Sequence, residues 1–161
     1  MIIEELEYYK DVDLPIFQAE FADWLPETIF DIHTHSWLPA HNLEPIFNER
    51  VGLIFEAESV SKEELQEVYK LLFPGKRLEY LVFGMPLTTV NRVANNNYIA
   101  QSINNQTSFG LYVAHPSEDA ETLEQKLKEG SFVGFKPYLS YVTWKALEDI
   151  RIRDFLTDAM L

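Results

Sequence analysis

Segments typical of strands and of helices alternate along this chain, and that alternation limits its fold more than any other feature. Apolar runs typical of strands occupy residues 28–33, 79–84, 109–114 and 132–138. Patterns typical of helices start at the capping box Ser61-Lys62-Glu63-Glu64, which opens a helix ending before Pro74, and recur over 91–105, 118–128 and 144–160. Such alternation predicts βαβ units around a parallel sheet with flanking helices, an α/β fold.

We expect one domain over residues 1–161, because no linker, repeat or charge block marks a boundary. Residues 1–27 would form an N-terminal helical extension, with a short amphipathic helix at 15–25. The asparagine-rich stretch 91–105 is interpreted as a helix with a polar outer face. The crossover after the first strand is unusually long and predicts a loop from Trp37 to Glu58. Loops at the carboxyl ends of strands are where α/β proteins place their sites.

Composition excludes several classes of function. There is no cysteine, so disulfides, thiol catalysis and thiolate metal sites are excluded. The 26 acidic residues outnumber the 13 basic ones, and a net charge of −13 argues against nucleic acid and anionic membranes as partners. No apolar run is long enough to span a membrane, and the acidic start lacks the layout of a signal peptide. We therefore expect a cytoplasmic protein.

The segment Asp31-Ile32-His33-Thr34-His35 is the most informative motif. Residues i and i+2 of a strand point to the same face, so His33 and His35 would stand together at the carboxyl end of the first strand. Two imidazoles so placed suit a divalent metal, with zinc preferred over manganese. Asp31 would lie one step deeper on the same face and orient an imidazole from behind. The alternative is a pair of structural histidines.

Lys136 places a charge inside an apolar strand, where it needs a charged partner, a lowered pKa or a covalent modification. It is the candidate catalytic residue, either as a metal-bridging carboxylated lysine or as a cation that holds a substrate carboxylate. The alternative is a lysine that reaches solvent at the strand end. Trp37, His115 and Tyr138 lie at strand ends or in the loop that follows and are the candidate substrate-binding residues. Loop hydrogen bonding for His115 and simple packing for Tyr138 stay open.

In this order, the segments resemble the amidohydrolase superfamily, in particular its amidohydrolase 2 branch. The resemblance covers about residues 20–160 and rests on Phe30-Asp31-Ile32-His33-Thr34-His35, Leu81-Val82-Phe83-Gly84-Met85-Pro86, the helix around Asn97, the strand end at 112–116 and the segment 130–138. It implies a metal-dependent TIM-barrel hydrolase in which His33 and His35 bind metal and a metal-activated water cleaves an amide or lactone. Lys136 matches the position where some members carry a carboxylated lysine.

The later ligands of that family lie on the fifth, sixth and eighth strands, and a full barrel takes ~250 residues. We therefore expect a partial (β/α)8 TIM barrel of about the first four βα units, the N-terminal half of a longer hydrolase. The expected substrate is a small molecule that carries a carboxylate. The chain of 161 residues would be inactive alone.

Two other functions stay open. An open parallel sheet has two unpaired edges and an apolar face, so the chain would be a non-catalytic half-barrel that binds a partner or self-associates as a homo-oligomer. The run Asp31-Ile32-His33-Thr34-His35-Ser36 also resembles the opening motif of PHP-type phosphoesterases, although no Thr-Asp-His tripeptide follows it.

Overall fold

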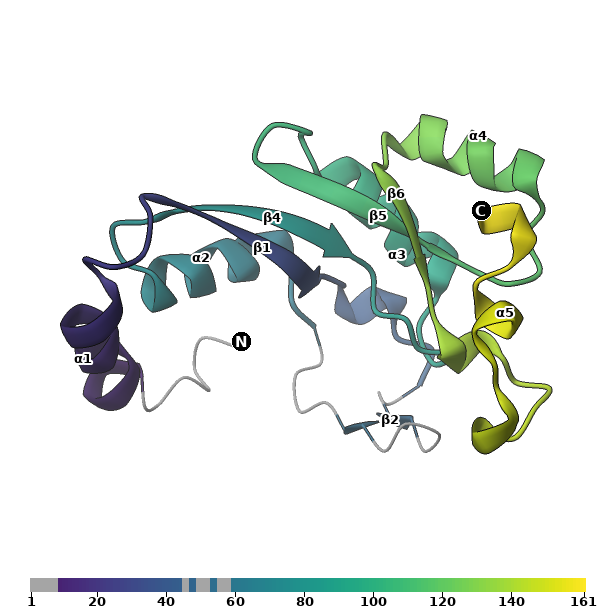
Figure 1. Cartoon of the computed structure of the whole chain (residues 1–161), viewed down its shortest axis with the longest axis horizontal. Coiled ribbons are helices and arrows are strands. Elements are labelled where there is room, and N and C mark those ends of the chain that lie inside the picture. The colour runs from purple at the N-terminus through teal and green to yellow at the C-terminus, as the bar shows by residue number, and fades with distance from the viewer. Residues whose placement is uncertain (1–8, 45–46, 49–52, 55–58) are drawn as a thin grey trace.

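A computed structural model describes residues 9–44, 47–48, 53–54 and 59–161. Its main feature is a sheet of four parallel strands in the order β1-β4-β5-β6, curled into a half-barrel (Figure 1). The strands are β1 (Thr28–His35), β4 (Arg77–Phe83), β5 (Ser108–Ala114) and β6 (Gly134–Pro137). The predicted α/β class, the four main strands and their parallel direction are confirmed.

The three long helices begin where the sequence supplies a cap. They are α2 (Lys62–Leu72), α3 (Arg92–Ser102) and α4 (Ala120–Gly130). The predicted capping box of α2 is present, because Ser61 Oγ accepts from the Glu64 amide and the Glu64 carboxylate accepts from the Ser61 amide. Asn91 and Asp119 cap α3 and α4 through side-chain oxygens that accept from backbone amides.

The three long helices pack on one side of the sheet, whereas the 3-10 turn Leu139–Tyr141 covers part of the concave side. Alternate residues of β4, such as Tyr80 and Val82, point toward Leu65 and Tyr69 of α2 and form the largest hydrophobic cluster. On β5, Tyr112 and other residues pack in the same way against α4. Residues at the intervening positions therefore face the hollow of the half-barrel.

Two asparagines of α3 point inward, a feature that the interpretation of this stretch as a helix with a polar outer face did not include. Asn95 and Asn96 are buried, whereas Asn97 is exposed. The Asn96 side chain donates to the Val113 carbonyl oxygen and accepts from the Val113 amide, at 3.0 Å in each case. A buried amide side chain is tolerated here because the end of β5 supplies both of its partners.

The two ends of the chain differ from the expected helices. The predicted helix over 144–160 is wrong, since the segment forms separate short turns: Leu147–Asp149, α5 (Ile152–Phe155) and Asp158–Met160. Helix formation restarts at Arg151, an extended residue whose amide donates to the Asp154 carboxylate at 2.7 Å. At the other end, helical turns run through Tyr9–Asp13, α1 (Leu14–Ile16) and Phe17–Phe21, so they begin before the short helix predicted at 15–25. The first eight residues of the predicted helical extension lie outside the described residues.

The predicted loop from Trp37 to Glu58 lies partly outside the described residues, and Glu58 is among those not described. Its described part holds a 3-10 turn, Pro39–His41, and the antiparallel pair β2 (Phe47–Asn48) and β3 (Leu53–Ile54). Within the described ranges, no helix has the length and apolar character needed to cross a bilayer.

Candidate metal and substrate site

A register shift in β1 determines which of its side chains face the hollow. Asp31 lies opposite Tyr80, and Thr34 lies opposite Val82, so three steps along β1 match two steps along β4. Such a bulge inserts one extra residue and re-aims the side chains that follow it. Because Tyr80 and Val82 face the helices, Asp31 and Thr34 share the helix side of the sheet. The histidines that flank Thr34 turn to the concave side.

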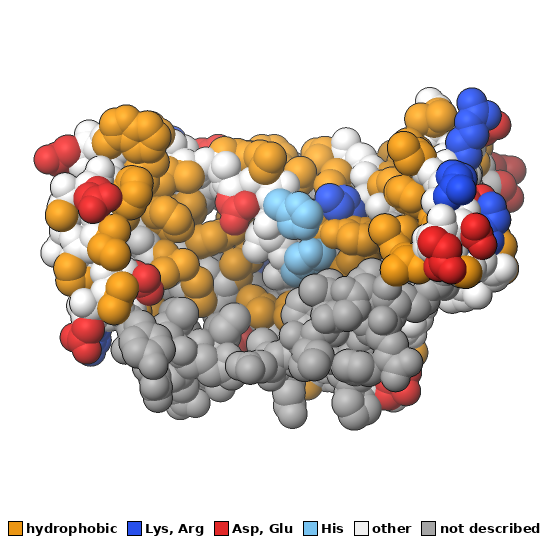
Figure 2. Space-filling view, turned by 60° about the horizontal axis from the view of Figure 1, so that its bottom comes forward, with side chains coloured by type: hydrophobic (Ala, Val, Ile, Leu, Met, Phe, Trp, Pro, Cys, Tyr) orange, Lys and Arg blue, Asp and Glu red, His pale blue; other side chains and the backbone are white. Residues whose placement is uncertain are grey.

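His33 and His35 lie together on the concave side, against the ring of Phe83. The two imidazole centroids are 5.4 Å apart, and they lie 5.0 Å and 4.5 Å from the Phe83 centroid, respectively. Figure 2 shows two histidine side chains side by side in the middle of one face, next to a basic side chain and bordered by hydrophobic side chains. The structure therefore brings the predicted imidazole pair together at the carboxyl end of β1.

One ring nitrogen of His35 is held by the backbone of the neighbouring strand. Its Nδ1 lies 3.1 Å from the carbonyl oxygen of Gly84, and a carbonyl oxygen can only accept, so Nδ1 carries the proton. Burial, aided by the nearby His33 and Lys136 and opposed by the hydrogen bond to Gly84, lowers the pKa of His35 to about 4. At neutral pH the ring is therefore uncharged, and its Nε2 presents a lone pair. This tautomer is the form in which imidazole binds metals.

Lys136 and Tyr138 extend this group on the same side. The Lys136 ammonium nitrogen lies 4.8 Å from the Phe83 ring centroid and 5.5 Å from that of Tyr138. The Tyr138 ring lies 6.4 Å from the His35 ring. Burial raises the pKa of Tyr138 to about 12, so its hydroxyl stays protonated. The predicted site residues from β1 and from the β6 region thus meet in one place.

Asp31 does not share a face with the histidines, which corrects the expectation from simple alternation. Its Oδ2 accepts from the Tyr69 hydroxyl at 2.8 Å, and its Oδ1 accepts from the His33 backbone amide at 2.9 Å. Burial raises the pKa of Tyr69, and Asp31 adds to that shift. Neither of these two bonds reaches an imidazole ring, so Asp31 anchors β1 to α2 and shapes the bulge instead.

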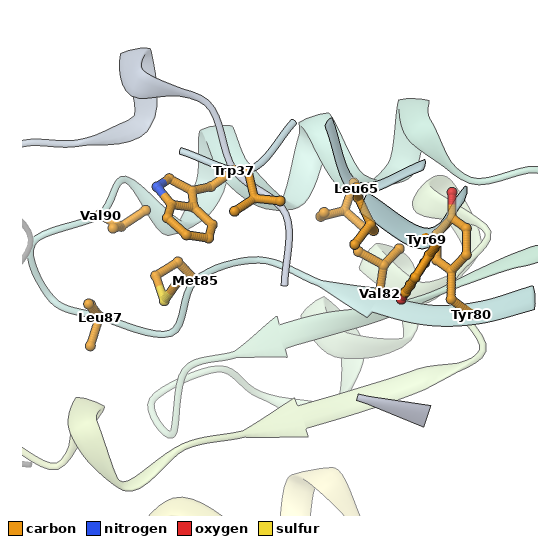
Figure 3. Close-up of a cluster of buried hydrophobic side chains, with 10 residues drawn as sticks. Trp37, Leu65, Tyr69, Tyr80, Val82, Met85, Leu87 and Val90 are labelled. Carbon is orange, nitrogen blue, oxygen red and sulfur yellow. The ribbon is translucent and has the colours of Figure 1, made fainter. Parts of the chain in front are cut away.

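Trp37 lies in the hydrophobic core and is 3% exposed. Figure 3 shows its indole beside Met85 and Val90, in the part of the cluster beyond the end of β4. Its backbone pairs with Val60 through two hydrogen bonds of 3.0 Å and 3.2 Å. A substrate contact by this side chain would require it to leave the cluster, so the structure gives that prediction no support.

His115 follows β5 and is hydrogen bonded within its own loop. Its Nδ1 lies 2.7 Å from Ser117 Oγ, and its ring centroid is 5.4 Å from that of Tyr141. Burial lowers its pKa, as does the nearby Arg92. Tyr141 packs with Phe83, so His115 reaches the concave side only through a second ring. The arrangement corresponds to the alternative of a hydrogen-bonded loop histidine.

Asn95 supports the site, and sequence reasoning missed it. It is 1% exposed, its Oδ1 accepts from the Met85 amide at 2.8 Å, and its Nδ2 donates to the Ser36 carbonyl oxygen at 2.9 Å. Ser36 follows β1 and Met85 lies just beyond β4, so this one side chain joins the ends of the two strands. A Cβ on Gly84 would lie 2.6 Å from Asn95 Oδ1, so the glycine makes room for this link. The signal available in the sequence was the combination of a glycine at the strand end with asparagines in the next helix.

The donor set for a metal is incomplete in the part of the chain that the structure describes. Within that part, no three histidine, cysteine, aspartate or glutamate side chains gather as a metal would require. Two imidazoles, one with a fixed tautomer, fit a zinc-type ion in chemistry but not in number. No protein-family model matches this sequence, and neither does any curated protein. The chemistry of the site itself must therefore carry any functional proposal.

Proposed function

We propose that this chain supplies the first metal-binding strand of a metal-dependent hydrolase of the amidohydrolase type, built on a TIM barrel. The observation that carries the proposal is the state of His35. The Gly84 carbonyl fixes its tautomer, burial keeps it uncharged, and its ring lies 5.4 Å from that of His33 with Nε2 left out of the hydrogen bond to Gly84. A hydrogen-bonded second nitrogen is the usual arrangement of a metal-ligating histidine.

His35 and His33 would hold the ion, and the described residues of one chain gather no third side chain with them, so further ligands must be added to this pair. A bound divalent metal supplies Lewis acidity, which lowers the pKa of water toward neutrality and polarises a carbonyl group. Zinc is preferred because imidazole nitrogen and an open coordination position are typical of catalytic zinc sites. Asn95 keeps the ends of β1 and β4 in register, so it fixes the height at which the imidazoles stand.

Lys136 would hold the carboxylate of the substrate. Its ammonium group lies over aromatic rings on the same side as the imidazoles, and no acidic side chain within the described residues forms an ion pair with it. An ammonium on an apolar wall attracts an anionic group strongly, because the surroundings screen it less than bulk water does. The protonated Tyr138 hydroxyl would donate a hydrogen bond to the same substrate.

Zinc titration of the chain tests the proposal. Isothermal calorimetry should show binding by the wild type, and His35→Ala should weaken it at least a hundredfold, since outer-shell changes alone cost tenfold or more. His41→Asn is the matched control, because the Leu38 amide donates to Nδ1 of His41 and an asparagine oxygen can replace that acceptor. Equal zinc affinity in wild type and His35→Ala would contradict the proposal.

A substrate panel separates the enzyme classes. We expect zinc-dependent cleavage of carboxylate-bearing lactones or amides in preference to phosphate esters once the full ligand set is present. Cleavage of phosphate esters alone would favour the phosphoesterase alternative.

A further inference from the structure

The half-barrel has two free edges that run in the same direction. Within the described residues, β1 pairs only with β4 in the main sheet, and β6 pairs only with β5. All four strands are parallel, so a two-fold axis along the strand direction preserves their sense. Such an axis forms two equivalent seams, and at each seam β6 of one copy lies beside β1 of the other. Eight parallel strands then close into a barrel.

We infer that two copies of this chain form one closed barrel in which each copy supplies ligands to a shared metal site. The inference rests on the proposed function for its metal-binding part only. We choose a second copy as the occupant of the concave face because the four described strands are half of the eight that close a small barrel. A second copy related by the two-fold axis supplies the other four.

Apolar side chains on the free edge strand support this choice. Phe30 on β1 faces the hollow, where its ring contacts Phe109 at 5.9 Å, yet it is 44% exposed. Ile32, in the bulge of the same strand, is 73% exposed. Large apolar side chains grouped at a sheet edge indicate a surface that another chain covers.

Charge permits the association although the chain as a whole is acidic. On the concave side of the described strands, Glu79 is the one acidic residue, and it lies 3.7 Å from Arg77. Lys136 adds a further positive charge there. Most of the acidic residues behind the net charge of −13 therefore lie outside the concave side of the described strands.

The exposed area is also larger than a compact monomer needs. A compact protein of 18.8 kDa exposes about 8,300 Å². This chain exposes 9773 Å². The excess of about 1,500 Å² exceeds the ~800 Å² that each partner buries in a standard interface.

Closure would complete the metal site. The two-fold axis places β1 of one copy four strands away from β1 of the other, on the opposite wall. An eight-stranded barrel is narrow enough for side chains from opposite walls to fill it. Four imidazoles, His33 and His35 from each copy, then share one interior. Three of them suffice for a catalytic zinc with an open position.

The test measures mass and zinc on the same samples. Light scattering after gel filtration should give about 38 kDa, twice the chain mass of 18.8 kDa. Ile32→Asp should yield a monomer with at least tenfold weaker zinc binding, although both histidines are retained. Val93→Asp is the control, because Val93 is 59% exposed on α3, outside the proposed interface, and should stay dimeric. Circular dichroism confirms that both variants fold.

The outcomes separate this inference from the proposed function. A wild-type monomer that binds zinc would overturn the inference and leave the proposed function standing. A dimer that Ile32→Asp dissociates but that binds no zinc would support barrel closure and contradict the proposed function. A dimer that Ile32→Asp leaves intact would overturn the inference, because the contact would lie elsewhere.

Discussion

The carboxyl ends of β1 and β5 both carry ionisable side chains, but they satisfy them in opposite ways. At the carboxyl end of β5, Arg92 from the start of α3 donates to Glu118, to the Tyr112 hydroxyl and to the Val113 carbonyl oxygen. Tyr112 in turn donates to Glu118 at 2.7 Å. At the end of β1, the hydrogen bond between the His35 ring and the Gly84 carbonyl oxygen uses Nδ1, and Nε2 takes no part in it.

The difference separates structural polar groups from functional ones. In the β5 network the charges compensate one another with little access to water, so the network has no capacity left for a ligand. The imidazole pair keeps that capacity, because the hydrogen bond to Gly84 uses only one nitrogen of the His35 ring. Both regions lie at the carboxyl ends of the strands, so position alone does not identify a site. The two regions differ in how completely their polar groups are hydrogen bonded, and we use that difference to identify the site.

Breaking the closed network should have the largest effect on stability. Arg92→Met leaves Glu118 with its charge and without its cationic partner, and we expect a loss of about 3 kcal/mol in the free energy of unfolding, measured with urea. Lys128→Met removes an exposed pair with Glu124 and should cost less than about 0.5 kcal/mol. Similar losses in the two variants would remove the contrast between the regions.

Cutting the link between strand ends should affect both stability and the site. Asn95→Ala leaves the Met85 amide and the Ser36 carbonyl oxygen without this partner, which should cost about 2 kcal/mol. Zinc affinity should fall as well, because the end of β1 is released. The exposed neighbour Asn97, changed to alanine, should alter stability by less than about 0.5 kcal/mol. Unchanged zinc binding in Asn95→Ala would show that the link is structural only.

At the open end, His35 should contribute a pH dependence of its own to the stability of the chain. The pKa of His35 is about 4 in the folded chain against an ordinary value of 6.5, so the unfolded chain binds more protons between these values. Stability should therefore rise with pH from about 4 to 6.5 and level off above that, with at most about 3 kcal/mol from this group. His35→Asn keeps a donor for the Gly84 carbonyl and should remove this component of the slope in metal-free urea titrations. A slope identical to that of the wild type would contradict the shifted pKa.

The smallest expected change in stability belongs to Lys136. Lys136→Met loses contacts with aromatic rings worth about 0.5–1 kcal/mol, while the aliphatic stem is kept. Binding of a probe carboxylate such as succinate should weaken at least tenfold, about 1.4 kcal/mol. Lys70→Met, which removes an exposed lysine on α2 paired with Glu67, should leave succinate binding unchanged.

Local patterns predicted the alternating architecture well because each pattern reports on its own segment. The capping box at Ser61 and the apolar run of β5 need no distant partner to be recognised. The paired imidazoles were also predicted from spacing. Features that depend on partners far away in the sequence were not, because the chain alone does not show which groups will meet.

The bulge in β1 and the inward asparagines of α3 are the clearest examples. Asp31 changes face because β1 must pair with β4, whose register is not encoded in the segment around Asp31. Asn95 and Asn96 appear polar and solvent-facing until the strand ends provide their partners. The helix predicted over 144–160 was wrong for a related reason, because the turns of this segment contact different elements rather than one face. Ala159 and Met160, for example, pack against the cluster that includes Leu123 of α4.

The extra residue in β1 also affects how protons and metal ions compete for the imidazoles. A carboxylate beneath a histidine ring makes the ring more basic, so protons would occupy it in mildly acidic solution. Here the Asp31 carboxylate lies behind the sheet, bonded to Tyr69, and the His35 ring stays a poor base. At slightly acid pH, a cation that enters the hollow would therefore meet His35 with its Nε2 unprotonated and able to bind a metal.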